Sequence, residues 1–353
     1  MFIKTSKIIY FNLLVFVTLL ILLEIFSGNL IFKKKLDCVY LLCERKFLIE
    51  TNFHYNLPSY VIDYQRDEFG FRDRESKFSD IDILTIGGST TDERFIKDED
   101  TWSKKLENRL SIYLNKQIDV VNAGIDGQST NGHIWNFNNW FNQLDNFHPK
   151  YIIFYIGLNE MLHQLPENYK RIYDNDYDFS KLNFSNKFKF IIKKNNGIFF
   201  KSYLIFYRKF FMRDKFNTSH LIDRKNSKYS EPYKKFIINE ETRKIFINNL
   251  NILYKKSMMI ESIPIFITQK TLRGKYENNK ILSIDSYDYF TFENNISNIV
   301  IDFCTQKKIK CLDGNKNFNF ILNDTYDLFH LSPSGSEKLS RFIFDELKNY
   351  LKI

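Results

Sequence analysis

The segment YIIFYIG at residues 151–157 limits the possible folds of this chain more than any other stretch. Its apolar residues do not alternate with polar ones, and strands of this kind are buried on both faces, as in a parallel sheet covered by helices. We predict four further strands, at residues 81–86, 118–121, 263–269 and 309–312. Segments with helical periodicity separate them, at residues 102–114, 134–147, 240–261 and 292–307.

Strands and helices that alternate in this way imply right-handed crossovers and a three-layer α/β/α sandwich with a mostly parallel five-stranded sheet. A final helix follows Ser332 and Pro333, and the spacing from Ser334 to Glu337 is that of a capping box.

The composition is that of a folded chain with one large domain. Of 353 residues, 44% are hydrophobic and 17% aromatic, which excludes the profile of disordered proteins. The net charge of +9 is local, because residues 187–216 hold nine Lys or Arg and one acidic residue, so no nucleic-acid partner is expected. We predict an anchor at residues 1–35, a connector at 36–80, and a domain at 81–353 with a helical insertion at about 161–239.

Residues 8–26 form an apolar run broken only by Asn12 and Glu24. Its length is close to the roughly 20 residues that cross a bilayer as a helix. Lysines flank the run on both sides, so the positive-inside rule gives no orientation. We predict an uncleaved single-pass transmembrane helix, with a cleaved signal peptide and a buried core helix as the alternatives.

The four cysteines form two close pairs, Cys38 with Cys43 and Cys304 with Cys311. Neither pair has the CxxC spacing of a zinc site, and no cluster of histidines accompanies them, so no metal or other cofactor is expected. Both disulfides and reduced packing residues are compatible with this spacing.

Glycines and polar residues follow the first three predicted strands. Gly87, Gly88 and Ser89 end the first strand, NAGIDGQST follows the second and GLNE the third. Ligands of open parallel sheets bind at the carboxyl ends of the strands, where the loops converge. We therefore expect a reaction site at this edge, with the Ser89 hydroxyl as nucleophile. Gln269, after the fourth strand, either lines this pocket or is a solvated strand end.

A serine hydroxyl needs a base to take its proton, and a histidine does this best when a carboxylate fixes its tautomer. Of the six histidines, only His330 closely follows a carboxylate, Asp327, in a loop that opens a terminal helix. Asp327 would orient the ring while His330 takes the proton from Ser89. The N–H groups of Ser89 and Gly127 and the side-chain amide of Asn159 are candidates for an oxyanion hole.

Each of these residues also has a purely structural interpretation. The GGST sequence suits a tight strand-to-helix turn with Ser89 or Thr90 as N-cap. Asp327 could be a turn residue, His330 a partly buried histidine, and Asn159 a partner of loop backbone groups. The other histidines, which we predict to be structural or surface residues, are His54, His133, His148, His163 and His220.

Four blocks of the chain resemble those of the SGNH/GDSL hydrolases, a superfamily of esterases and lipases with a flavodoxin-like α/β/α fold. IGGSTT, NAGIDG, IGLNE and DLFHL occur in the order and approximate spacing of the family's blocks, over roughly residues 68–351 apart from the insertion. The resemblance implies a catalytic triad of Ser89, His330 and Asp327. It also implies an oxyanion hole made by the Ser89 amide, Gly127 and Asn159.

Two positions depart from the family pattern. Gly88 stands where the GDSL form has Asp, and Glu160 stands where Asp is usual. Neither change removes an atom of the triad. GFRD and TWSKKLENRL also look like the membrane-anchored GGST-type members of the superfamily. By analogy with those members, we expect an extracytoplasmic domain.

The insertion contains a basic, aromatic stretch at residues 187–216, where ten Phe or Tyr are interleaved with the nine basic residues. A helix of this kind can lie at a membrane surface, with its rings in the interface and its cations at anionic head groups. The alternatives are a lid that binds an acidic glycan or lipid-linked substrate, and a helical subdomain whose rings simply pack.

Together these features predict a serine esterase that hydrolyses acyl esters through an acyl-enzyme. The resemblance implies small acyl esters as substrates, including O-acetyl groups on cell-envelope glycans or lipids. An O-acyltransferase would use the same triad to acylate a polysaccharide. A noncatalytic glycan-binding or assembly protein could keep the same fold.

Overall fold

The structure is a computed structural model of the 353-residue chain. It divides into two compact units, one of residues 1–42 and 178–213 and the other of residues 43–177 and 214–353. The domain boundaries that we inferred from the sequence stay a prediction. The structure describes residues 2–28, 36, 43, 46–51, 60–72, 74–164, 184–195, 197, 198, 202, 206, 214, 215, 228–236, 238–284 and 286–353.

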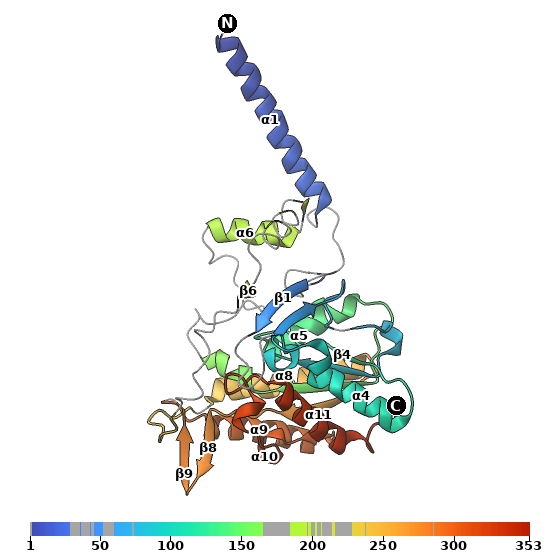
Figure 1. The fold of residues 1–353 in the computed structure, drawn as a ribbon, viewed down its shortest axis with the longest axis vertical. Helices are drawn as coiled ribbons and strands as arrows, with labels where there is room; N and C mark the ends of the chain where they lie inside the picture. The colour runs from blue at the N-terminus through green and yellow to red at the C-terminus, as the bar shows by residue number, and fades with distance from the viewer. Residues whose placement is uncertain are drawn as a thin grey trace. The chain divides into compact units, whose positions relative to one another are not determined.

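The second unit is built on a five-stranded sheet in which all neighbouring strands are parallel (Figure 1). The spatial order β10-β7-β5-β3-β4 corresponds to the 2-1-3-4-5 order of flavodoxin-like folds. The predicted α/β fold with a parallel five-stranded sheet is therefore confirmed. Its strands are β3 (Ile83–Gly87), β4 (Val120–Asn122), β5 (Tyr151–Ile156), β7 (Ile263–Thr268) and β10 (Cys311–Leu312).

Helices cover both faces of this sheet, which explains why β5 has no polar face. On one face, α4 (Trp102–Leu114) packs against α11 (Pro333–Leu347) over a cluster that includes Ile153 of β5. The other face carries α5 (Thr130–Asn139), α8 (Glu240–Met259) and α9 (Tyr289–Lys307). There the next residue of β5, Phe154, stacks on Phe266 with ring centroids 4.8 Å apart.

Three helices depart from their predicted bounds, namely α5 (predicted at 134–147), α8 (predicted at 240–261) and α9 (predicted at 292–307). Helix α5 begins at Thr130 instead of residue 134, because the Ser129 hydroxyl caps it by accepting a hydrogen bond from the Asn131 N–H. Helix α11 is capped by Ser332, which accepts from the Gly335 N–H. The predicted capping box at Ser334 does not form, since its hydroxyl donates instead to an Asp324 carboxylate oxygen at 2.9 Å.

Several short elements complete the second unit. Strands β8 (Gly274–Glu277) and β9 (Lys280–Ser283) form a hairpin whose turn residues, Asn278 and Asn279, have φ of 50° and 60°, as a type I′ turn requires. The remaining strands are β1 (Lys46–Thr51), β2 (Tyr60–Gln65) and β6 (Asp214–Lys215). The short helices are α3 (Ser89–Asp92), α10 (Gly314–Asn317), η1 (Phe78–Asp80), η2 (Asp98–Asp100), η3 (Phe141–Gln143), η4 (Leu158–Gln164) and η9 (Leu322–Asp324).

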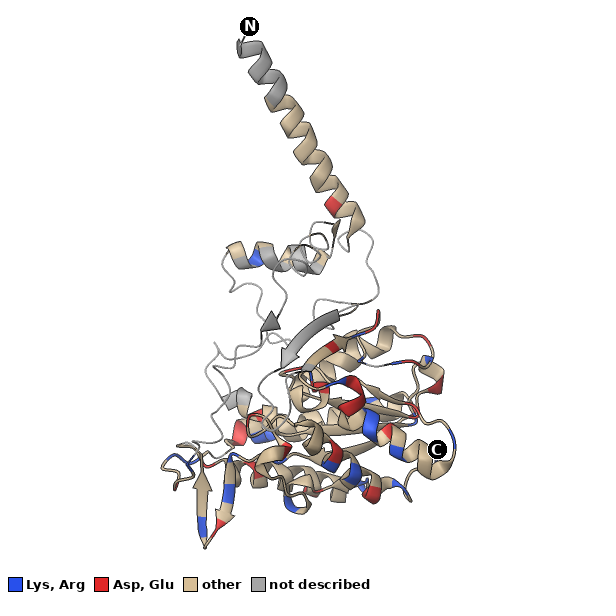
Figure 2. Cartoon of the chain, viewed as in Figure 1, with Lys and Arg blue, Asp and Glu red and all other residues tan. Residues whose placement is uncertain are grey.

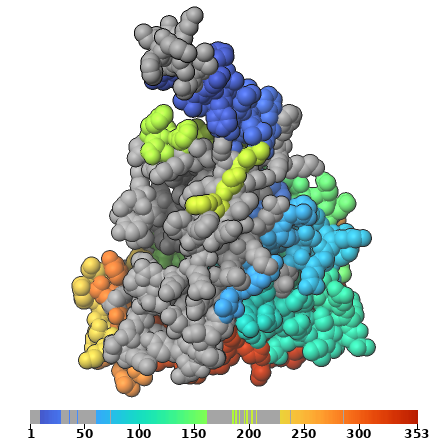
Figure 3. All heavy atoms as spheres, turned by 45° about the horizontal axis from the view of Figure 1, so that its top comes forward, coloured from blue at the N-terminus to red at the C-terminus, as the bar shows by residue number. Residues whose placement is uncertain are grey.

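Residues 60–72, from the segment that we predicted as a connector, pack tightly within the second unit. The Arg72 N–H donates to the Asn122 carbonyl of β4 at 3.0 Å, and the side chains of Tyr64 and Phe71 are fully buried. Figure 3 shows this segment in light blue, next to the teal residues of the sheet and its helices. Tyr64 and Phe71 are therefore part of the core of this unit.

The first unit contains α1 (Phe2–Ser27) and α6 (Phe184–Asn195). Within the described part of the chain, one helix is long and apolar enough to span a membrane, with a mean hydropathy of 2.2 over Tyr10–Ser27 and none of that stretch buried. Its place near the N-terminus is also that of a signal sequence. Much of the predicted insertion at 161–239 lies outside the described residues.

Charges and cysteines complete the description. Lys and Arg are interspersed with Asp and Glu along the coloured ribbon of the second unit (Figure 2). A disulfide joins Cys304 near the end of α9 to Cys311 in β10. Cys43 is also disulfide-bonded, whereas Cys38 lies outside the described residues.

A buried carboxyl group, that of Glu93, connects three helices around the carboxyl end of the sheet. Glu93 is the left-handed C-cap residue of α3, with φ of 47°. Its Oε2 accepts from the Trp102 N–H at the start of α4 at 2.7 Å, and its Oε1 accepts from the Ser336 hydroxyl of α11. Burial raises the pKa of Glu93 from 4.5 to about 8, against the opposing effect of these two hydrogen bonds.

We predict that Glu93 makes the protein less stable as the pH rises. The folded state keeps this proton up to about pH 8, whereas the unfolded chain loses it near 4.5. Between these values, the free energy of unfolding should therefore fall by up to about 1.4 kcal/mol per pH unit from this group. The unfolding free energy, measured by urea at several pH values, should fall less steeply with pH in Glu93→Gln than in the wild type. Glu99→Gln, at a side chain that is 69% exposed, is the control. An equally steep fall of the unfolding free energy with pH in all three proteins would contradict the raised pKa of Glu93.

Candidate active site

Ser89 is the first residue of α3 and directly follows the turn at the end of β3. Close contacts surround the two glycines before it. A Cβ at Gly87 would overlap the Thr91 hydroxyl and lie 2.8 Å from the Tyr155 carbonyl. A Cβ at Gly88 would overlap the Asn159 amide nitrogen. The glycine that replaces the family's Asp therefore makes room for a candidate oxyanion donor.

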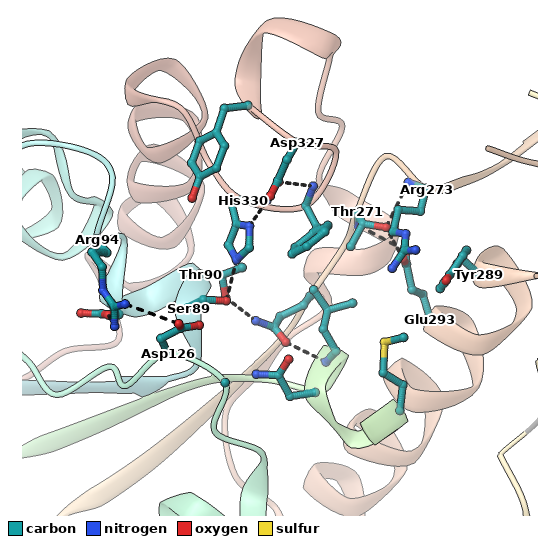
Figure 4. A pocket seen from close by; sticks show the side chains of 18 of the residues that line it. Ser89, Thr90, Arg94, Asp126, Thr271, Arg273, Tyr289, Glu293, Asp327 and His330 are labelled. Atoms are coloured by element: carbon teal, nitrogen blue, oxygen red, sulfur yellow. Dashed lines mark hydrogen bonds and ion pairs between the residues drawn. The ribbon is translucent and has the colours of Figure 1, made fainter. Parts of the chain in front are cut away.

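His330 brings the end of the chain to Ser89. Its Nε2 lies 2.7 Å from Ser89 Oγ, and its Nδ1 lies 2.5 Å from Asp327 Oδ2 (Figure 4). The other oxygen, Asp327 Oδ1, accepts from the backbone N–H groups of Phe329 and His330 at 3.3 and 2.8 Å. The structure thus brings Ser89, His330 and Asp327 together in one continuous hydrogen-bonded chain. This is the arrangement in which an imidazole can remove the serine proton.

The loop that carries this pair is held on both sides. Leu328 has a positive φ of 79°, an uncommon conformation for a branched residue, and its carbonyl accepts from the Leu272 N–H at 2.7 Å. The His330 ring contacts two aromatic rings, with centroids 4.1 Å from that of Phe329 and 5.5 Å from that of Tyr326. These contacts restrict the imidazole to the orientation in which it reaches Ser89.

The three candidate oxyanion donors line one cavity of about 530 Å³. Ser89, at the start of α3, has a backbone N–H without a partner within the helix. Gly127 has φ of 79°, which favours glycine at this position. Asn159 Nδ2 donates to the Gln128 carbonyl at 2.8 Å, and an amide nitrogen has a second hydrogen to offer. Their roles in binding an oxyanion stay a prediction.

Two further polar side chains fix the loops around the cavity. Gln269, which is buried and lines the cavity, accepts from the Leu158 N–H at 2.8 Å and donates to Thr90 Oγ1 at 2.7 Å. It thereby links the loop of Asn159 to the helix of Ser89. Glu160, the second departure from the family pattern, accepts from the N–H and hydroxyl of Thr130 at 2.8 and 3.0 Å. Its carboxylate thus links the loop after β5 to the first residue of α5.

A buried charge network lies behind the nucleophile, and the sequence analysis did not identify it. Asp92 Oδ1 accepts from the Tyr64 hydroxyl at 2.7 Å and from Arg66 Nη1 at 3.0 Å, with both charged side chains fully buried. Arg66 also donates to the Gly124 carbonyl at 2.9 and 2.8 Å. It therefore joins the helix of Ser89 to the loop that carries Gly127.

Electrostatics within this network favour the charged pair. Burial alone would raise the pKa of Asp92, but the positive charges of Arg66, Arg94 and Arg72 and the hydrogen bond from Tyr64 outweigh burial and lower it. The GFRD motif was the sequence signal for part of this network. Its arginine, Arg72, is fully buried and donates to the carbonyl of Asp92.

His133 and His148 do not take part in this arrangement. His133 is buried in α5, where burial lowers its pKa to about 3, and its Nδ1 lies 3.3 Å from the Gln128 side-chain oxygen. His148 is exposed. His54 and His220 lie outside the described residues, and His163 lies in η4. Among the described residues, no group of three or more His, Cys, Asp or Glu is suited to hold a metal ion.

Comparison with known proteins gives one match to a family. The family model described as GDSL-like lipase/acylhydrolase matches residues 83–187, the part that carries Ser89, Gly127 and Asn159. This match confirms the predicted resemblance to the SGNH/GDSL hydrolases and supports ester hydrolysis. It does not address the membrane-anchored subgroup. No curated protein matches the chain.

Several solved structures are similar to the chain. TesA has 12% identity and a TM-score of 0.44, covering 76% of this chain and 98% of its own. Axe2, an acetylxylan esterase from Geobacillus stearothermophilus, has 16% identity and a TM-score of 0.43, covering 75% and 93%. The esterase EstA from Pseudoalteromonas sp. has 12% identity and a TM-score of 0.41, covering 77% and 98%. The likeness at these scores is distant.

We predict that breaking the buried pair destabilises the protein. Arg66→Met leaves the carboxylate of Asp92 buried without its main counterion, which should cost about 3–5 kcal/mol of unfolding free energy. Adding Asp92→Asn should recover part of this loss, because the uncompensated charge is removed. Denaturant unfolding of the wild type, of Arg66→Met and of the double variant measures these changes in unfolding free energy. Arg341→Met, at an exposed arginine of α11, is the control, and a double variant less stable than Arg66→Met would refute the explanation.

Proposed function

We propose that this chain is a serine esterase that cleaves acyl esters through an acyl-enzyme on Ser89. The observation that carries the proposal is the hydrogen-bonded chain from Asp327 through His330 to Ser89 Oγ, with distances of 2.5 and 2.7 Å. Two further facts support it. Ser89, His330 and Asp327 all line a cavity of about 530 Å³. The residues that match the GDSL-like family model include Ser89.

The reaction follows from the positions of these atoms. His330 Nε2 accepts the Ser89 proton as Oγ bonds to the ester carbonyl carbon, and the carbonyl oxygen becomes an oxyanion that the N–H donors at Ser89, Gly127 and Asn159 stabilise. Asp327 keeps Nδ1 protonated and stabilises the imidazolium. His330 then gives its proton to the alcohol as the ester C–O bond breaks. Water, deprotonated by His330 in turn, attacks the acyl-enzyme and restores Ser89.

The substrate class that we propose is small acyl esters, including O-acetyl groups on cell-envelope glycans or lipids. An O-acyltransferase would use the same atoms, with a sugar hydroxyl in the place of water in the second half-reaction. The ratio of hydrolysed to transferred acyl groups, measured with para-nitrophenyl acetate in the presence of added sugar alcohols, separates the two activities. A noncatalytic glycan-binding protein of the same fold would show neither.

We predict that a fluorophosphonate probe labels the wild-type protein and does not label Ser89→Ala. His330→Ala should be labelled more slowly by a factor of at least about a thousand, because the serine then lacks its base. Labelling is read by mass spectrometry of the tryptic peptide that contains Ser89. His148→Ala, at an exposed histidine, is the matched control and should be labelled like the wild type. Equal labelling of all four proteins would end the nucleophile assignment.

We also propose that α1 is a single-pass anchor and that the catalytic unit is extracytoplasmic. The side chains of α1 that the structure describes are mostly apolar and exposed, as a lipid-facing helix requires. Within the same unit, the Asn195 amide of α6 donates to the Glu24 carbonyl at 2.9 Å, and α6 exposes Phe184, Phe188 and Ile191 at helical spacing. This supports a membrane-surface role for residues 187–216, of which the structure describes only part.

We predict that the mature protein keeps its N-terminal residues and stays in the membrane fraction after alkaline carbonate extraction. A cleaved signal peptide would instead give a mature protein that begins after α1, which intact-mass measurement detects. A variant lacking residues 1–35 should still bind liposomes and prefer those with anionic lipid, because of the cations at 187–216. Binding without a preference for anionic lipid would contradict the membrane-surface role of residues 187–216. It would not affect the proposal that α1 is an anchor.

A further inference from the structure

The Gln269 side chain spans the carboxyl ends of three neighbouring strands. Gln269 directly follows β7, and the next strands along the sheet are β5 and then β3. Its amide contacts the segments that leave both of these strands, because it reaches the Leu158 N–H after β5 and the Thr90 hydroxyl after β3. Thr90 is the residue next to the nucleophile (Figure 4). A side chain in this position can set the distance between the residues that leave the two strands.

The two hydrogen bonds determine the orientation of the amide group. A backbone N–H can only donate, so the atom that lies 2.8 Å from the Leu158 nitrogen must be the Gln269 oxygen. The amide nitrogen therefore faces Thr90 Oγ1 and donates to it at 2.7 Å. Gln269 is buried, with 7% of its surface exposed. Both contacts are therefore costly to lose, because a buried polar group without its partner is destabilising.

A glutamine suits this link for chemical reasons. The link needs a donor at one end, an acceptor at the other, and no negative charge near the carbonyl oxygen that becomes negative in the reaction. An amide provides both on one planar, uncharged group, and asparagine is one methylene shorter than glutamine. Methionine is unbranched and flexible but lacks the N–H donor and has only a weak acceptor. Methionine is thus the replacement that fills the space and removes the link.

Gln269 completes a set of three links between the candidate oxyanion donors. The buried charge pair behind the nucleophile joins the helix of Ser89 to the loop of Gly127. The Asn159 amide joins its own loop to that of Gly127, because it donates to the carbonyl of the next residue, Gln128, at 2.8 Å. Gln269 joins the loop of Asn159 to the helix of Ser89. The three segments that carry the donors are thus connected in pairs.

The segment from which Gln269 extends is itself held in place. Thr268, the last residue of β7, pairs with β5, and its hydroxyl accepts from the Asn315 N–H at 3.1 Å. Two residues beyond Gln269, the Thr271 hydroxyl accepts from the Arg273 N–H at 3.1 Å, and the Thr271 N–H donates to the buried Glu293 carboxyl at 3.2 Å. The backbone is therefore fixed on both sides of Gln269, which makes its side chain a spacer of defined length.

We propose that Gln269 is a positioning residue that sets the distance between the Ser89 N–H and the Asn159 amide in the oxyanion hole. This inference rests on the proposed esterase function. Groups that stabilise a transition state must be held within about 0.5 Å of their productive positions, and Gln269 acts through the two donors to achieve this. The competing explanation is structural, in that Gln269 only satisfies two polar groups of the fold.

The test compares two substrates of the full-length chain in detergent, para-nitrophenyl acetate and its thiono analogue, in which sulfur replaces the carbonyl oxygen. Sulfur is a weak hydrogen-bond acceptor, so aligned donors favour the oxygen ester. Gln269→Met should lower kcat/KM by about 10- to 100-fold for the oxygen ester and by less than about 3-fold for the thiono ester. Gln117→Met, at an exposed glutamine before β4, is the matched control and should keep the wild-type ratio of the two values.

This ratio is the deciding measurement. A variant that is partly unfolded loses the same factor for both esters, so a purely structural role leaves the ratio unchanged. Thr90→Val removes one end of the link and should lower the ratio as well. The double variant should lie within about 3-fold of Gln269→Met, because the two substitutions act on one contact. Losses that multiply in the double variant would contradict the link.

Two results separate this inference from the function on which it rests. An unchanged ratio in Gln269→Met would overturn the inference and leave the esterase function standing. A wild type that hydrolyses neither ester and is not labelled by the fluorophosphonate probe would contradict the proposed function, and the inference with it.

Discussion

The hydrogen bond between Ser89 Oγ and His330 Nε2 joins residues 241 positions apart, and the proposed chemistry depends on it. Each end is fixed independently. The serine end is fixed by the glycine turn and by the buried Arg66–Asp92 pair, which links α3 to the loop of Gly127. The histidine end is fixed by Asp327 and by the Leu272–Leu328 backbone contact. Glu93 connects the two, because it accepts from α11 while it ends α3.

Features that depend on local sequence could be predicted. The parallel sheet followed from strands without alternation, such as β5, which is buried on both faces. The positions of Ser89 and His330 followed from the rule that strand ends converge, together with the four-block resemblance. Helix α4 was predicted with its exact limits from its leucines at spacing four, and the structure adds Thr101 as its N-cap. For the strand and the helix the signal lies within one short segment, and for the site it lies in four short blocks.

Features that depend on contacts between distant segments could not be predicted. Tyr64 of β2 and Arg66, which follows this strand, carry no motif in the sequence, and only the folded chain brings both to Asp92. Arg273 and Glu293 carry no motif, and only the folded chain brings them to the cavity wall. The start of α5 was misplaced for a different reason. Its first turn is polar and buried by Glu160 and Asn249 rather than by apolar packing, so hydrophobic periodicity begins one turn too late.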